Sequence, residues 1–206
     1  MKISLGIPSF SFLCAASALS LGCVSTPWTI VRQTDPDPFI SQRDWVVEPL
    51  RYDNLVIDGE PAQQYLGERD QARMMGDPRF QRDVRIDLAK MSDAFVWRLT
   101  QNQGPIHVAP SNGPGAFTIR ASVHGVSTGL PRGNPSFGAS VAPAQAFLSL
   151  TLLDPEGREL DVVDMQTEVD PDALPMNDAE RIPECGVRIG ELALAYLGTR
   201  VDTLVR

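Results

Sequence analysis

The clearest hydrophobic pattern in the chain predicts an amphipathic helix over residues 83–103. Apolar residues recur there at steps of three and four: Val84, Leu88, Met91, Phe95 and Leu99. This spacing places them on one face, and Gly104 follows where a helix C-cap favours glycine. Trp97 lies off the apolar stripe, and edge packing is favoured for it over contact with a partner. A second apolar helical face runs from Val187 to Leu204, so we expect two main helices.

Apolar and polar residues alternate strictly over 117–124, which predicts a strand buried on one face, with His124 on its polar side. Ala146–Leu153 and Leu160–Val169 flank the turn signal Asp154-Pro155-Glu156-Gly157 and are expected to form a hairpin. Trp45–Leu50 and Ile106–Ala109 are shorter strand candidates.

Three regions lack such a pattern. Residues 24–43 contain Asp35-Pro36-Asp37-Pro38 and show no usable period, so we interpret 23–43 as a tether. Residues 54–81 are predicted to be mainly irregular, with room for a short helix over 62–73. Residues 125–143 are rich in Gly, Pro and Ser and are expected to form a mobile loop, whose Leu130 and Phe137 are possible partner contacts.

These elements follow the order β-α-β-β-β-β-α. Helices that each have one apolar face, beside such strands, predict an α/β (α+β) sandwich. In it a mixed sheet of about four to five strands packs against two main helices. The chain has 206 residues, and its part from 44 to 206 has the size of a single domain.

The amino terminus has the pattern of an export signal over residues 1–22. Lys2 precedes an apolar run from Ile3 to Leu21, which ends in Ser20-Leu21-Gly22-Cys23. That ending resembles the lipobox of bacterial lipoproteins, which implies cleavage before Cys23 and lipidation of its thiol. Cleavage after Ala18 would instead give a soluble secreted or periplasmic protein. An uncleaved anchor is the weakest interpretation, because Pro8 and several serines dilute the apolar run.

Charge and cysteine content narrow the possible partners. The formal net charge is -8, and Lys2 and Lys90 are the only lysines, which argues against nucleic acid and against a polybasic membrane patch. Cys14 is lost with the signal and Cys23 is expected to carry lipid. Cys185 then remains as a small apolar residue near the start of the last helix. Without acylation, a bridge between Cys23 and Cys185 would become possible.

No catalytic or metal-binding motif in the chain is predicted to form a working site. Gly125-Val126-Ser127-Thr128-Gly129 matches the G-x-S-x-G elbow, but the prolines that follow forbid the required helix, and His107 and His124 both precede the serine. Two distant histidines and Cys185 do not make a zinc site. The acidic hairpin residues lack EF-hand spacing and are expected to be solvated: Asp154, Glu156, Glu159 and Asp161. We therefore predict no catalytic, cofactor-binding or metal-ligating residue.

The order of lipobox, tether, strand, helix, strands and final helix resembles a class of bacterial envelope lipoprotein domains. This class includes the amino-terminal domain of TolB, the curli-secretion lipoprotein CsgG and the peptidoglycan-synthase activator LpoB. The resemblance implies a non-enzymatic protein that is lipid-anchored in the outer membrane, faces the periplasm and binds other envelope proteins. The alternative is an envelope enzyme or small-ligand carrier whose site is invisible in the sequence. A deep pocket with converging charged groups would favour that alternative, and a shallow sheet face would favour an interaction module.

Overall fold

A computed structural model describes residues 27–77, 83–110, 116–129, 142–170 and 180–201. The predicted lipidation site Cys23 and the predicted contacts Leu130 and Phe137 lie outside these residues. The elements are β1 (Trp28–Arg32), β2 (Asp44–Val47), β3 (Val56–Ile57), β4 (Glu60–Pro61), α1 (Ala62–Met74), α2 (Val84–Thr100), β5 (His107–Pro110), β6 (Thr118–Ser127), β7 (Ala144–Leu153), β8 (Glu159–Val169) and α3 (Arg181–Val201).

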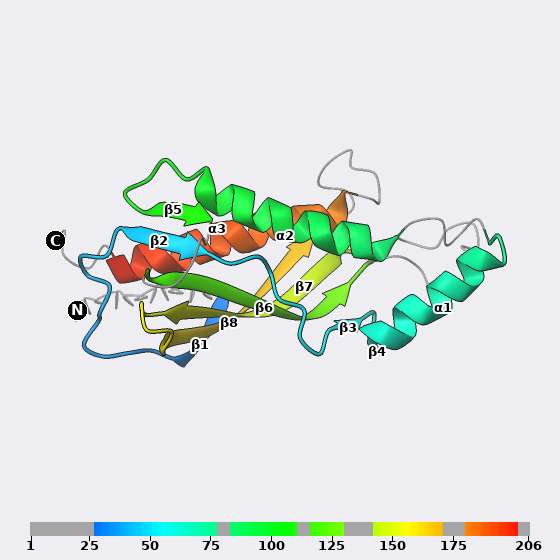
Figure 1. The fold of residues 1–206 in the computed structure, drawn as a ribbon, viewed down its shortest axis with the longest axis horizontal. Coiled ribbons are helices and arrows are strands. Elements are labelled where there is room, and N and C mark those ends of the chain that lie inside the picture. Colours follow the sequence, from blue (N-terminus) through cyan, green and yellow to red (C-terminus); the bar gives the residue numbers. More distant parts are fainter. Residues whose placement is uncertain (1–26, 78–82, 111–115, 130–141, 171–179, 202–206) are drawn as a thin grey trace, which may run out of the picture.

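The strands form one mixed sheet with the order β1-β8-β7-β6-β2-β5 (Figure 1). The central strands β6, β7 and β8 are antiparallel neighbours, and the predicted hairpin of β7 and β8 is confirmed. Strands β2 and β3 both run parallel to β6. Strand β2 pairs with the first residues of β6, and β3 pairs with its last residues. The described residues contain an eight-stranded sheet, which has more strands than the four to five expected, while the mixed α/β class is confirmed.

Helices α2 and α3 lie side by side across one face of this sheet, whereas α1 lies at one end beside β3 and β4 (Figure 1). The two long helices approach closely at Gly186, where an added Cβ would lie 2.1 Å from the carbonyl oxygen of Met91. One turn later, Gly190 faces the side chain of Arg98. Glycines four residues apart therefore set the α2–α3 contact. Among the described helices, none has the length and apolar character needed to cross a membrane.

The tether prediction for 23–43 is wrong for its described part. Trp28–Arg32 pairs antiparallel with β8 as an edge strand, and the Trp28 ring packs edge-on against Tyr196 of α3. Farther along, Phe39 is fully buried and contacts the Trp45 ring. A five-residue edge strand is too short to show a period, so the pattern gave no sign of it.

Three other boundaries differ from expectation. The irregular segment 54–81 contains β3, β4 and α1, and α1 covers the short helix that we allowed there. The predicted loop over 125–143 begins later, because Gly125, Val126 and Ser127 still pair with β7. Helix α2 ends at Thr100 with Gln101 as its C-cap, so the predicted cap at Gly104 is wrong.

A buried polar network ties the amino-terminal segment to α3. Asp161 has no solvent exposure and accepts hydrogen bonds from the Tyr196 hydroxyl at 2.7 Å and the Arg200 Nε at 2.8 Å. The same carboxylate accepts from the backbone N–H of Thr34 at 2.9 Å, and Arg200 also pairs with Asp37 at 2.8 Å. The expectation of a solvated carboxylate is wrong for Asp161, because this residue occupies an inward-facing register position of β8. It is also wrong for Asp154, which is buried in the turn and accepts hydrogen bonds from Arg158.

Candidate functional site

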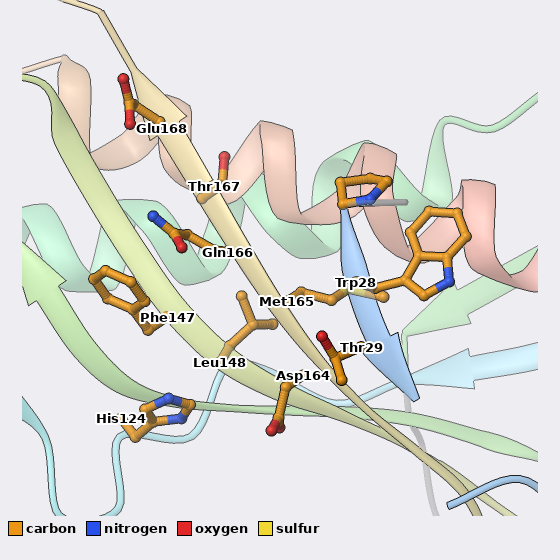
Figure 2. A pocket seen from close by; sticks show the side chains of 11 residues that line it. Trp28, Thr29, His124, Phe147, Leu148, Asp164, Met165, Gln166, Thr167 and Glu168 are labelled. Carbon is orange, nitrogen blue, oxygen red and sulfur yellow. The ribbon is translucent and has the colours of Figure 1, made fainter. Parts of the chain in front are cut away.

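The central strands give the sheet two different faces. Residues that alternate with the buried positions of β6, β7 and β8 face away from α2 and α3. We call this surface the open face and define it by Ser122, His124, Ser127, Gln145, Phe147, Ser149, Asp164, Gln166 and Glu168. Figure 2 shows Phe147, His124, Asp164 and Glu168 on the near side of the sheet, with the two helices behind it. No helix of the described part of the chain covers this face.

Strand register arranges the open face in rows that run across the sheet. Directly paired residues are expected to contact one another, since their side chains project on the same side. The pairs are Ser122 with Ser149, Ser149 with Asp164, Asp164 with Thr29, Gly125 with Phe147, Phe147 with Gln166, Ser127 with Gln145, and Gln145 with Glu168. The row that contains Phe147 lies between two polar rows.

Phe147 is the aromatic centre of the open face. Its paired residue Gly125 has no side chain, and a Cβ added there would lie 3.2 Å from Cδ2 of the Phe147 ring. The ring therefore lies against the glycine backbone, a packing arrangement that fills the gap glycine leaves in a sheet. A β-bulge at His124 shifts the register just before this pair. Bulges commonly redirect side chains beside functional surfaces.

Two hollows flank the Phe147 ring. The first has a volume of about 510 Å³ and is lined by Pro27, Trp28, Thr29, His124, Phe147, Leu148, Asp164, Met165, Gln166, Thr167 and Glu168. The second has a volume of about 440 Å³, and its lining includes Val56, Asp58, Gly59 and Ser127. Both hollows are open to solvent. Phe147 lines both, so one ring separates two adjoining depressions of the sheet surface.

Two carboxylates on β8 give the first hollow a negative charge. Asp164 accepts a hydrogen bond from the Ser149 hydroxyl at 2.6 Å, and Glu168 accepts from the Gln145 amide at 2.8 Å. Within the described part of the chain, neither carboxylate forms an ion pair. Both side chains are exposed, so they can each take a further cationic hydrogen-bond donor.

Glu48, near the other end of β6, shows the opposite arrangement. Arg120 donates to both of its carboxylate oxygens at 2.8 and 3.0 Å, and Arg51 lies 2.9 Å away. These arginines, first the hydrogen bonds from Arg120, hold the pKa of Glu48 below its ordinary value. Its charge is therefore satisfied within the molecule, unlike the charges of Asp164 and Glu168.

The residues of the G-x-S-x-G match do not form a nucleophile site. Ser127 ends β6 and lines the second hollow. The nearby Asp58 carboxylate accepts hydrogen bonds from the backbone N–H of Thr128 at 2.8 Å and from its hydroxyl at 2.7 Å. His107 lies on the edge strand β5, with β2 between it and β6, and His124 lines the other hollow. The structure thus does not bring Ser127 and His107 together.

Cys185 occupies a buried position in α3 and is a free thiol. Burial, with a smaller contribution from Glu184, raises the pKa of its thiol to about 12. The expectation of a small apolar residue near the start of the last helix is confirmed, because a protonated buried thiol packs like an apolar group. Among the described residues, no group of three or more His, Cys, Asp or Glu is placed to hold a metal ion.

Phe147 is a site residue that was not predicted from the sequence. Phe147 belongs to Ala146–Leu153, which was predicted as one strand of a hairpin and not as part of a site. The signal was present in its neighbours two and four positions away, because Gln145, Ser149 and Thr151 mark the outward-facing register that Phe147 shares.

Comparisons with known proteins do not assign this chain to a family. No family model matches the sequence, and no curated protein matches it. Among solved structures, a PelC dodecamer from Paraburkholderia phytofirmans is 8% identical, with a TM-score of 0.30, covering 80% of this chain and 96% of that one. A DUF330 protein from Xanthomonas campestris is 13% identical, with a TM-score of 0.38, covering 82% of this chain and 91% of that one. These scores are too low to carry an argument about this chain.

Proposed function

We propose that this chain is a lipid-anchored protein of the bacterial outer membrane that faces the periplasm and acts as a non-enzymatic interaction module. Its contact surface is the open face of the sheet. The observation that carries this proposal is the placement of Phe147, a half-buried ring between two solvent-open hollows on a sheet face that no described helix covers.

The composition of the open face supports a protein contact. Interfaces commonly place an aromatic anchor at the centre and a polar rim around it. Phe147 has that central position, and the rim consists of hydrogen-bonded pairs such as Ser149 with Asp164 and Gln145 with Glu168. An enzyme or small-ligand carrier would favour an enclosed pocket with converging charged groups, whereas both hollows here are shallow and open.

The anchor is proposed from the lipobox-like ending Ser20-Leu21-Gly22-Cys23. Mass spectrometry of the mature amino terminus tests it. Acylated Cys23 as the first residue is the expected result, and an unmodified chain that begins after Ala18 would contradict the anchor.

The contact surface is tested by photo-crosslinking in intact cells. A photoreactive residue replaces Phe147 in one variant and Trp97 in a control variant. Trp97 is 57% exposed on α2, so a substitution there leaves the core intact. We expect discrete protein adducts from position 147 and none from position 97. The same adducts from both positions, or none from position 147, would refute the open face as the contact surface.

A further inference from the structure

The described chain begins at the first hollow. Pro27, Trp28 and Thr29 all line it, and β1 is held there by its pairing with β8. If Cys23 carries the lipid, only residues 24–26 separate it from Pro27. Four residue steps span at most about 14 Å even when fully extended. The lipid is therefore attached within about 14 Å of the hollow rim, whatever the conformation of the connecting residues.

This distance changes what the open face can reach. A tether over 23–43 would let the domain move far from the bilayer and turn in any direction. The pairing of β1 with β8 removes most of that length, because Trp28–Arg32 belongs to the sheet. The first hollow therefore stays close to the membrane surface, and a partner that fills it must also be close to that surface.

The charge of the hollow limits the chemistry of the partner. Asp164 and Glu168 line it without an ion pair in the described part of the chain, and the Phe147 ring lies beside them. Charge-assisted hydrogen bonds to carboxylates are stronger than neutral ones, and arginine also stacks on aromatic faces. A segment with Arg or Lys beside apolar residues complements both features. The second hollow, on the other side of the ring, gives room for more than one side chain of such a segment.

We propose that the open face binds a cationic peptide segment of a partner protein that lies at the membrane surface. This inference rests on the proposed function and specifies the class of its partner. Arg or Lys side chains of the partner pair with Asp164 and Glu168, and a neighbouring apolar side chain packs on Phe147.

The test uses the full mature acylated chain in phosphatidylcholine vesicles. The probe is a short peptide of alternating Arg and Leu, coupled to a lipid in the same vesicles, and binding is read by energy transfer between dyes on peptide and protein. We expect the variant with Asp164→Asn and Glu168→Gln to bind the probe about tenfold more weakly, which corresponds to about 1.4 kcal/mol.

A matched control removes two charges elsewhere. Asp93→Asn on α2 and Glu68→Gln on α1 make the same change in net charge, and Glu68, like Glu168, is exposed and accepts a hydrogen bond from a glutamine. We expect the control to bind the probe like the unmodified chain. Equal losses in the two double variants, or no loss in the open-face variant, would overturn the proposal.

A second arm tests the short connection. A flexible Gly/Ser segment of about 30 residues inserted between Thr26 and Pro27 should weaken binding of the lipid-coupled probe, because effective concentration falls with linker length. The same insertion should leave binding of the free peptide unchanged. Unchanged binding of the lipid-coupled probe would contradict the membrane-proximal part of the proposal.

A third arm separates peptide from lipid as the occupant. If the chain without its acyl groups associates with phosphatidylethanolamine vesicles when no peptide is present, and the open-face variant loses that association, the headgroup ammonium occupies the hollow and the peptide proposal is overturned. Failure in any of these arms leaves the in-cell crosslinks from position 147 and the acylation of Cys23 intact. Loss of those two results would instead refute the proposed function itself.

Discussion

The two faces of the central sheet are built from the same strands and differ in what packs on them. Ala146, Leu148 and Leu150 of β7 point toward the helices and are completely buried, while Phe147 and Ser149 between them point to the open face. Because the side-chain period of a strand is two, one sequence carries both surfaces. The covered face supplies the burial that stabilises the fold, and the open face is left available for contacts.

The covered face tolerates little change in volume. The backbones of α2 and α3 approach so closely at Gly186 that no Cβ fits, and the buried polar network around Asp161 connects α3, β8 and the amino-terminal segment. On the open face, side chains pair across strands, and no described segment forms a second layer above them. Substitutions should therefore separate into those that affect stability and those that affect binding.

The largest expected effect is that of Gly186→Ala. The new methyl carbon would meet the Met91 carbonyl oxygen at 2.1 Å, so the two helices must move apart. We expect a loss of about 3 kcal/mol or more in the free energy of unfolding, measured by urea titration. Gly198→Ala is the control, since nothing lies within 4 Å of its added Cβ, and it should be neutral or stabilising by up to about 1 kcal/mol. Equal midpoints for the two variants would contradict the close helix contact.

The next effect concerns the buried network. Asp161→Asn removes the charge that faces Arg200, and breaking a buried ion pair typically costs about 3 kcal/mol. Tyr196→Phe removes only one hydrogen bond to the same carboxylate and should cost about 1 kcal/mol. Hydrogen exchange of residues 33–39 should rise in Asp161→Asn, because the asparagine amide has one acceptor oxygen in place of two and cannot accept from Thr34 on one side and from Arg200 on the other. Unchanged exchange there would show that the network does not hold the segment.

A smaller effect is expected at Glu48, and it depends on pH. Its pKa in the folded chain is lowered, so its stabilising contribution is complete above the unfolded value of 4.5 and is lost as the pH falls through the folded value. Glu48→Gln should cost about 1 kcal/mol at most near neutral pH, because the pair with Arg120 is partly exposed. The stability difference from the unmodified chain should shrink in acid. A difference that stays constant between about pH 7 and about pH 3 would refute this assignment.

The smallest effect on stability is expected on the open face. Asp164→Asn combined with Glu168→Gln should change the free energy of unfolding by no more than about 0.5 kcal/mol, because both side chains are exposed and unpaired with cations in the described chain. Thermal melting checks this directly. A large loss would mean that these carboxylates support the fold and are not free for a partner.

The spacing of apolar residues predicts much of the fold, and the elements that it does not predict have identifiable causes. Helix α2, helix α3 and the β7–β8 hairpin are long enough for their patterns to be read. The two-residue strands β3 and β4 are not. Strand β3 forms because the neighbouring backbone of β6 offers hydrogen-bond partners, and β4 pairs with β3. Asp161 looked like a turn residue because its partner Tyr196 comes 35 residues later in the chain.

The candidate site was less predictable than the fold. No motif marks the open face, and its residues come from separate strands that become neighbours only through register. Leu130 and Phe137, which the sequence favoured as contacts, lie outside the described residues. Phe147 could be found only by noticing that a phenylalanine occupies a register position otherwise filled by Gln145, Ser149 and Thr151.

The most direct test compares two adjacent residues of β7, Phe147 and Leu148, by urea unfolding of their alanine variants. Leu148 is completely buried, so Leu148→Ala should cost about 3 to 5 kcal/mol. Phe147 is half-buried on the open face, and Phe147→Ala should cost about 1 to 2 kcal/mol, since its ring contacts Gly125 and no described segment packs above it. This result would show that burial on the covered face stabilises the fold and that the open face is available to a partner. A loss for Phe147→Ala as large as that for Leu148→Ala would contradict the account, because the open face would then be part of the core.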